Sequence, residues 1–155
     1  MGKYSLEVKR KDIVSEEDAV TQFMSFLNFY KLDLDESAKQ INEQQKKEST
    51  NSDEIGDVYV KSIRQGYYEI TTNSNGNVEI TQYLENKINE IETITYGVIK
   101  GKNRVQAGTT QSSDGETRTV ALLNSLSNTA GNIVEKLRGN DYTKACEIGS
   151  LYFLV

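Results

Sequence analysis

The sequence contains no histidine, and this absence narrows the chemistry that its 155 residues can perform. Histidine is the commonest general base and a leading metal ligand near neutral pH, so serine and cysteine triads that depend on it are excluded. The single cysteine, Cys146, cannot form an internal disulfide and fits a reducing compartment. We interpret Cys146 as a small apolar residue packed in a C-terminal helix.

Long apolar runs are also missing. No stretch approaches the roughly 20 apolar residues that span a bilayer, and the N-terminus lacks the apolar segment of a signal peptide. We therefore expect no membrane association and a cytoplasmic location. The hydrophobic fraction of 36% is below the usual globular range, so part of the chain is expected to depend on a partner for burial.

Charge and motif spacing argue against nucleic-acid binding and catalysis. The formal net charge is −5, and the only basic cluster, Lys9 to Lys11, is short. The acidic runs Glu16 to Asp18 and Asp33 to Glu36 lie at expected helix starts, where negative side chains meet the helix dipole. Gly97 to Lys102 lacks the spacing of a phosphate-binding loop. We predict no enzyme activity, no cofactor and no metal site.

The first part of the chain reads as mainly helical. Tyr4 to Val8 alternates like a short half-buried strand. A helix is predicted from Glu16 to Tyr30, with a capping pattern at Ser15 and Asp18. Asp35 to Glu48 favours an exposed, weakly held helix followed by a polar linker. Another helix is predicted to start near Asp53 and to end before Gly66, which suits a positive φ.

A β-hairpin is the clearest signal in the second part. Tyr67 to Thr72 and Val78 to Leu84 are strand-like runs joined by a turn that contains Asn75 and Gly76. Glu92 to Ile99 favours a third strand. Apolar spacing then predicts three helices after a polar loop at residues 108–115: one with Val120, Leu123 and Leu126, a short one with Ile133, Val134 and Leu137, and a last one capped by Asp141 and carrying Ala145, Ile148 and Tyr152.

The helix from Glu16 to Tyr30 has an unusually broad apolar face. Its stripe is formed by Val20, Phe23, Met24, Leu27 and Tyr30, and it is widened by Phe26 and Phe29. Core packing explains such a stripe, and a partner surface is the alternative. If Phe26, Phe29 and Tyr30 lie outside the core, they are the predicted partner-binding residues.

The order of elements from Ser62 to the end resembles a known family. The segments that carry the resemblance are Ile63 to Ile70, the hairpin through Val78 and Leu84, Glu92 to Tyr96, Ala121 to Ser127, Ile133 to Leu137 and the pair Asp141-Tyr142. This part of the chain is similar to the small tail assembly chaperones of tailed phages. This resemblance implies binding to tape-measure or tail-tube proteins in the host cytoplasm. A virion structural protein of the neck, tail or head surface, placed in the virion, is the first alternative, and a non-phage regulatory binding protein is the second.

These observations predict an α+β fold with a small antiparallel sheet of three to four strands, including the hairpin near residues 67–84, packed against several helices. We expect a single domain over residues 1–155, with a helical part at 1–65 and a hairpin-plus-helices part at 66–155. Self-association is left open.

Overall fold

The computed structural model describes residues 13–32, 52–101, 103 and 115–155. In chain order, it contains α2 (Glu16–Phe29), α4 (Ser52–Arg64), β1 (Tyr68–Thr72), β2 (Val78–Ile88), β3 (Ile91–Tyr96), α6 (Gly115–Leu126), the 3₁₀ helix η1 (Ile133–Lys136) and α7 (Gly139–Tyr152). The predicted α+β class is confirmed. The sheet has three antiparallel strands in the order β1-β2-β3.

The turn between β1 and β2 is fixed by one asparagine and one glycine. The Asn73 side-chain oxygen accepts hydrogen bonds from the backbone N–H groups of Asn75 and Asn77 at 2.9 and 3.0 Å. Gly76 has a φ of 81°, a conformation that residues with a Cβ atom adopt only at a steric cost. The register then places Ile70 opposite Ile80 and Thr72 opposite Val78. The hairpin signal is therefore confirmed with its turn chemistry.

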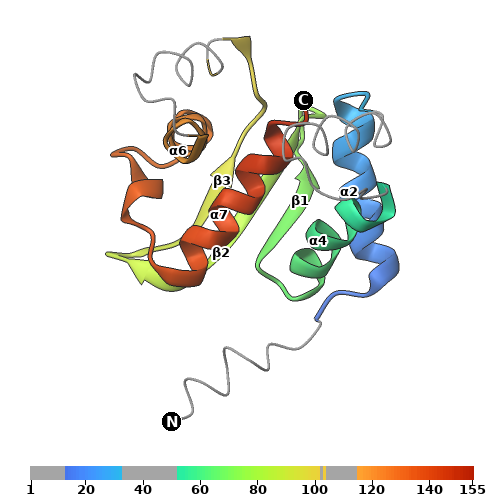
Figure 1. Cartoon of the computed structure of the whole chain (residues 1–155), viewed down its shortest axis with the longest axis horizontal. Coiled ribbons are helices and arrows are strands. Elements are labelled where there is room, and N and C mark those ends of the chain that lie inside the picture. Colours follow the sequence, from blue (N-terminus) through green and yellow to red (C-terminus); the bar gives the residue numbers. More distant parts are fainter. Residues whose placement is uncertain (1–12, 33–51, 102, 104–114) are drawn as a thin grey trace.

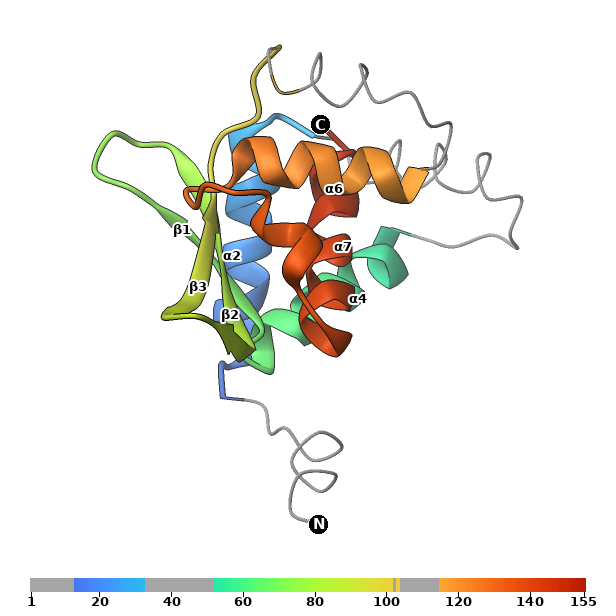
Figure 2. The same cartoon turned by 90° about the vertical axis from the view of Figure 1, so that its left-hand side faces the viewer.

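All the described helices lie on one face of this sheet. α7 runs across it, α2 and α4 lie on the β1 side, and α6 lies on the β3 side, as the two orthogonal views show (Figures 1 and 2). Because successive side chains of a strand point to opposite faces, every second side chain of the sheet points away from the helices. The outward side chains are those of Glu69, Thr71, Glu79, Thr81, Tyr83, Thr93 and Thr95.

The core is rich in aromatic rings from distant parts of the chain. Phe26 of α2 meets Tyr152 of α7 edge to face at a centroid distance of 5.5 Å. Phe23 stacks on Tyr59 of α4 at 5.6 Å. Such pairs contribute beyond the apolar area they bury. These contacts join α2 and α4 to the helices that follow the hairpin in one hydrophobic core.

The buried face of α2 is rotated relative to the predicted stripe. Helix bounds and the cap agree with expectation, since the Ser15 side chain accepts a hydrogen bond from the Asp18 N–H at 3.1 Å. However, Val20 and Met24 are 40% and 42% exposed, and Ala19 is fully buried in their place. Their assignment to the inner face was wrong, because the stripe was wider than the strip of helix that neighbouring elements cover.

Asp141 does not cap α7 as predicted. It lies in the first turn of that helix, is almost fully buried, and turns its carboxylate toward β2. There it accepts hydrogen bonds from the backbone N–H groups of Glu85 and Asn86 at 2.8 and 3.0 Å. These donors lie where the β2–β3 register shifts, between Tyr83 and Ile88. Asp141 therefore satisfies strand donors at an irregular part of the ladder.

Several expectations lie outside the described residues. They concern the strand at Tyr4 to Val8, the basic cluster at Lys9 to Lys11, the helix at Asp35 to Glu48 and the polar loop at residues 108–114.

Candidate functional site

The three residues predicted to bind a partner occupy different environments. Phe26 is fully buried between Tyr30 and Tyr152, so it belongs to the core and cannot contact a partner in the folded chain. Phe29 is half-buried and packs edge to face on Tyr30 at 4.9 Å. Tyr30 is also half-buried. The condition set for a partner surface therefore fails for Phe26, and partner binding by Phe29 and Tyr30 stays a prediction.

Tyr30 connects α2 to the segment that follows β3. Its hydroxyl oxygen accepts a hydrogen bond from the Ile99 N–H at 3.1 Å, and burial raises the pKa of this phenol. The bond holds the chain at Ile99 beside the end of α2. That segment forms one wall of a hollow of about 220 Å³ near the hairpin tip, lined by Asn73, Asn77, Glu79, Val98, Lys100, Asn103, Ser125 and Leu126.

Asparagine side chains hold two walls of this hollow in place. Asn73 organises the turn of the hairpin, as described above. Asn103 is 3% exposed; its oxygen accepts from the Lys100 N–H at 2.8 Å, and its amide nitrogen donates to the Ser125 carbonyl and hydroxyl oxygens at 3.3 and 3.0 Å. Each wall is therefore fixed by a side chain bonded to backbone, and the hollow is pre-formed.

Two opposite charges line the hollow without an internal partner. Glu79 comes from β2 and is half-buried, whereas Lys100 lies beyond β3 and is exposed. Across the described part of the chain, neither side chain forms a hydrogen bond or an ion pair. The lining also includes the apolar residues Val98 and Leu126. This arrangement offers one anionic, one cationic and one apolar contact to a small group.

The sequence does not predict that the hairpin tip and the segment after β3 lie side by side and form this hollow. The sequence predicts the hairpin turn that contains Asn75 and Gly76, and Gly97 to Lys102 only fails the spacing of a phosphate-binding loop. Their approach is tertiary, because it depends on Asn103 reaching α6 and on Tyr30 reaching Ile99. No spacing in the sequence encodes that contact.

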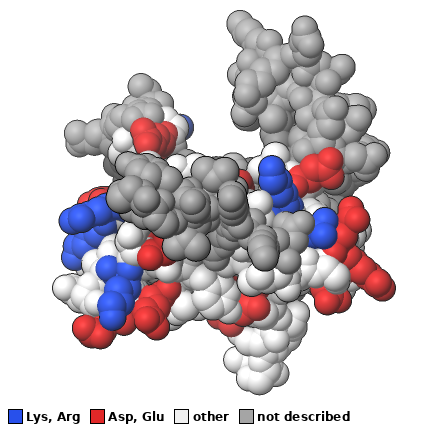
Figure 3. All heavy atoms as spheres, turned by 90° about the horizontal axis from the view of Figure 1, so that it is seen from below, with Lys and Arg blue, Asp and Glu red and all other residues white. Residues whose placement is uncertain are grey.

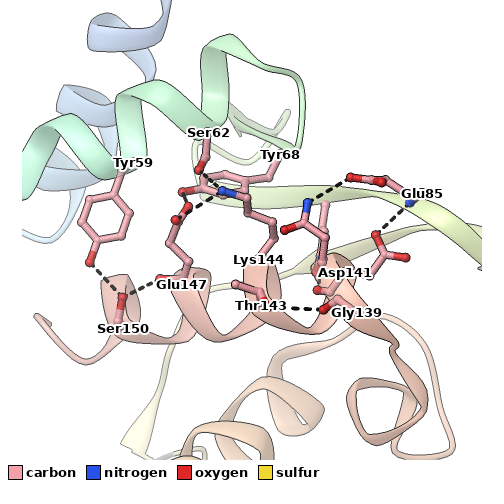
Figure 4. A network of polar contacts seen from close by, with 12 residues as sticks. Tyr59, Ser62, Tyr68, Glu85, Gly139, Asp141, Thr143, Lys144, Glu147 and Ser150 are labelled. Carbon is pink, nitrogen blue, oxygen red and sulfur yellow. Dashed lines mark hydrogen bonds and ion pairs between the residues drawn. The ribbon is translucent and has the colours of Figure 1, made fainter. Parts of the chain in front are cut away.

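A second cluster of polar side chains lies between α4, β1 and α7 (Figure 4). The Lys144 ammonium donates to the Ser62 hydroxyl at 2.8 Å, lies 3.6 Å from Glu147, and sits over the Tyr67 ring at 4.6 Å from its centroid. A serine beside a lysine is one arrangement for nucleophilic catalysis. Here the ammonium also contacts Glu147 and the Tyr67 ring, and Ser62 is only 1% exposed. The Ser62 hydroxyl is therefore out of reach of a substrate.

The rest of this cluster joins the same elements. The Tyr68 hydroxyl donates to Glu147 at 2.5 Å, and the Tyr59 hydroxyl shares a hydrogen bond of 2.9 Å with Ser150. Burial, followed by the negative charge of Glu147, raises the pKa of Tyr68 well above its usual value. A phenol that stays neutral suits the role of a fixed hydrogen-bond donor. We interpret the cluster as a structural tie between α4, β1 and α7.

Cys146 lies in α7, as predicted, but is half-buried and not fully packed. Burial raises the pKa of its thiol, although a hydrogen bond with Tyr142 acts in the opposite direction. The Tyr142 hydroxyl donates to Glu116 of α6 at 2.6 Å, and this bond raises the pKa of Tyr142. A thiol with a raised pKa is a weak nucleophile at neutral pH.

No group of three or more acidic or cysteine side chains in the described ranges could hold a metal ion. None of the helices described is long and apolar enough to cross a membrane. On the face seen from below, acidic and basic side chains are interspersed rather than gathered into a field of one sign (Figure 3).

Comparisons with protein-family models, with curated proteins and with solved structures found no match for this chain.

Proposed function

We propose that this chain works by binding other proteins, as a phage tail assembly chaperone or a related morphogenesis factor that contacts tail components in the host cytoplasm. The observation that carries the binding part of this proposal is the hollow at the hairpin tip. Its walls are fixed by Asn73 and Asn103, yet its charges at Glu79 and Lys100 are not used within the described chain. Fixed walls lower the entropic cost of association.

The polar chemistry elsewhere supports binding over catalysis. Ser62 and Lys144 are committed to a buried tie, and the Cys146 thiol has a raised pKa. The phage part of the proposal rests on the resemblance of residues 62–155 to tail assembly chaperones. A chaperone of this kind would hold apolar surface of a tape-measure or tail-tube protein until polymerisation begins.

Co-expression with tape-measure and tail-tube proteins encoded near this gene tests the proposal. The tagged chain should co-purify with one of them and increase its soluble fraction, and mass spectrometry of mature particles should not detect the chain. Presence in particles at a fixed copy number would instead identify a virion structural protein. Failure to bind any tail component would refute both phage readings and leave a non-phage regulatory binding protein.

A further inference from the structure

Among the described residues, no hydrogen bond or ion pair meets the Glu79 carboxylate at the hairpin-tip hollow. Glu79 is half-buried. Removing a carboxylate from water costs free energy unless a hydrogen-bond donor or a cation contacts it. Lys100 lines the same hollow, and the two side chains do not form an ion pair with each other. The hollow is therefore lined by one negative and one positive group that are not paired with each other.

We propose that this hollow binds a ligand that carries a cationic group beside a carboxylate. The ligand's cation meets Glu79, its carboxylate meets Lys100, and its carbon atoms contact Val98 and Leu126. The carboxamide of Asn77 can donate to or accept from either polar end. Charge-assisted hydrogen bonds at both ends give such a ligand an advantage over one with a single charge.

The size of the hollow restricts the ligand. At about 220 Å³ it is smaller than the roughly 300–1,000 Å³ of sites for cofactors and drug-sized molecules. A group the size of one amino acid fits this space. The same chemistry has two sources: a free amino acid, or neighbouring basic and acidic side chains on the surface of a bound protein. The second source rests on the proposed function.

Amide chemical-shift titration of the full chain separates these sources. The probes are L-alanine, and a capped Gly-Lys-Glu-Gly peptide whose only charges are on its side chains. Acetate and methylammonium, each supplying one charge, are the reference ligands. We expect millimolar binding of L-alanine or of the peptide, with the largest shifts at the amides of Asn77, Glu79 and Lys100, and binding of each reference ligand weaker by about tenfold.

Charge-removing variants then test the two contacts. Glu79→Gln and Lys100→Gln should each weaken binding by about tenfold or more. Glu90→Gln and Lys136→Gln remove exposed charges elsewhere and should leave binding unchanged. Thermal unfolding shows whether each variant is as stable as the unchanged chain. If Glu79→Gln is destabilised, Lys100→Gln alone tests the inference, because Lys100 is exposed and its replacement should leave the fold intact.

Each outcome decides the inference. Binding of L-alanine identifies a free amino acid as the source, and binding of the peptide alone identifies side chains of a protein. Binding of neither probe, equal binding of acetate or methylammonium, or no effect of Lys100→Gln would overturn it. If tail proteins still co-purify with both variants as with the unchanged chain, a side-chain pair on those proteins is ruled out, whereas the proposed function stands.

Discussion

Replacing Asp141 by Ala should cost this fold more than any loss of a helix cap. The substitution removes the acceptor of two hydrogen bonds, from the Glu85 and Asn86 N–H groups at 2.8 and 3.0 Å. A hydrogen bond to a charged group contributes about 1.5–3 kcal/mol. Glu85 and Asn86 are exposed, so water can replace part of this, and we expect a loss of about 2–4 kcal/mol in the free energy of unfolding.

Urea denaturation of the unchanged chain, Asp141→Ala and Asp141→Asn measures this effect. Asp141→Asn keeps one acceptor oxygen and should lose about half as much, roughly 1–2 kcal/mol. Asp57→Ala removes an exposed carboxylate from α4 and should change stability by less than about 0.5 kcal/mol. Unchanged denaturant slopes would show that the denatured state is the same in each case.

Amide hydrogen exchange distinguishes the strand contact from a helix cap. If Asp141 holds the strand, exchange at Glu85 and Asn86 should accelerate in Asp141→Ala by more than exchange in the middle of α7. A stability loss below about 1 kcal/mol, with unchanged exchange at both strand amides, would refute the reasoning, because a capping residue alone contributes about that much.

Three further tests concern the hairpin turn, the buried face of α2 and the Cys146 thiol. Gly76→Val should cost about 1–3 kcal/mol in urea denaturation because φ is 81° there, whereas Gly76→Asn should cost less, and equal effects would contradict the turn. Phe26→Ala should lose about 3–5 kcal/mol and Phe29→Ala about 1 kcal/mol, and the reverse order would move Phe26 out of the core. Alkylation of Cys146 at pH 8 should be slower in the folded chain than in urea, because the raised pKa leaves less thiolate; equal rates would contradict its burial.

Local chemistry explains why the hairpin could be read from the sequence. The turn signal at residues 73–77, the Ser15 cap and the positive φ of Gly66 all depend on residues within a few positions of one another. The third strand was less accurate: it was predicted to reach Ile99 but ends at Tyr96. Beyond it the Gly97 N–H donates to the Leu126 carbonyl and the Ile99 N–H to Tyr30, so tertiary partners replace the ladder.

The face of α2 shows a different limit. Apolar spacing predicted that one side of this helix is buried, and it is, but Val20 and Met24 at the margin are exposed. Periodicity gives the direction of an apolar stripe within the helix. How much of the stripe is covered depends on where β1, α4 and α7 lie, and those positions are set by contacts such as Phe23–Tyr59 and Phe26–Tyr152. Those contacts join residues far apart in the sequence.

The hollow could not be predicted from the sequence either, because it also depends on contacts between residues far apart in the chain. Its lining comes from the hairpin tip with Asn73, Asn77 and Glu79, from Val98, Lys100 and Asn103, and from Ser125 and Leu126, and the Asn103 side chain bonds the second group to the third. An asparagine three residues after Lys100 gives no signal that its amide will reach the end of α6.

The edges of the sheet bear on how a partner protein could bind. Gln22 of α2 accepts a hydrogen bond from the Ile70 N–H at the outer edge of β1, at 2.9 Å. At the outer edge of β3, the Thr95 N–H donates to the Asn128 side chain and the Asn128 N–H donates to the Thr95 carbonyl. A strand added to either edge would have to displace these bonds. For the proposed binding of other proteins, we therefore expect contacts at the hairpin tip, where Glu79 and Lys100 can be reached without breaking these hydrogen bonds.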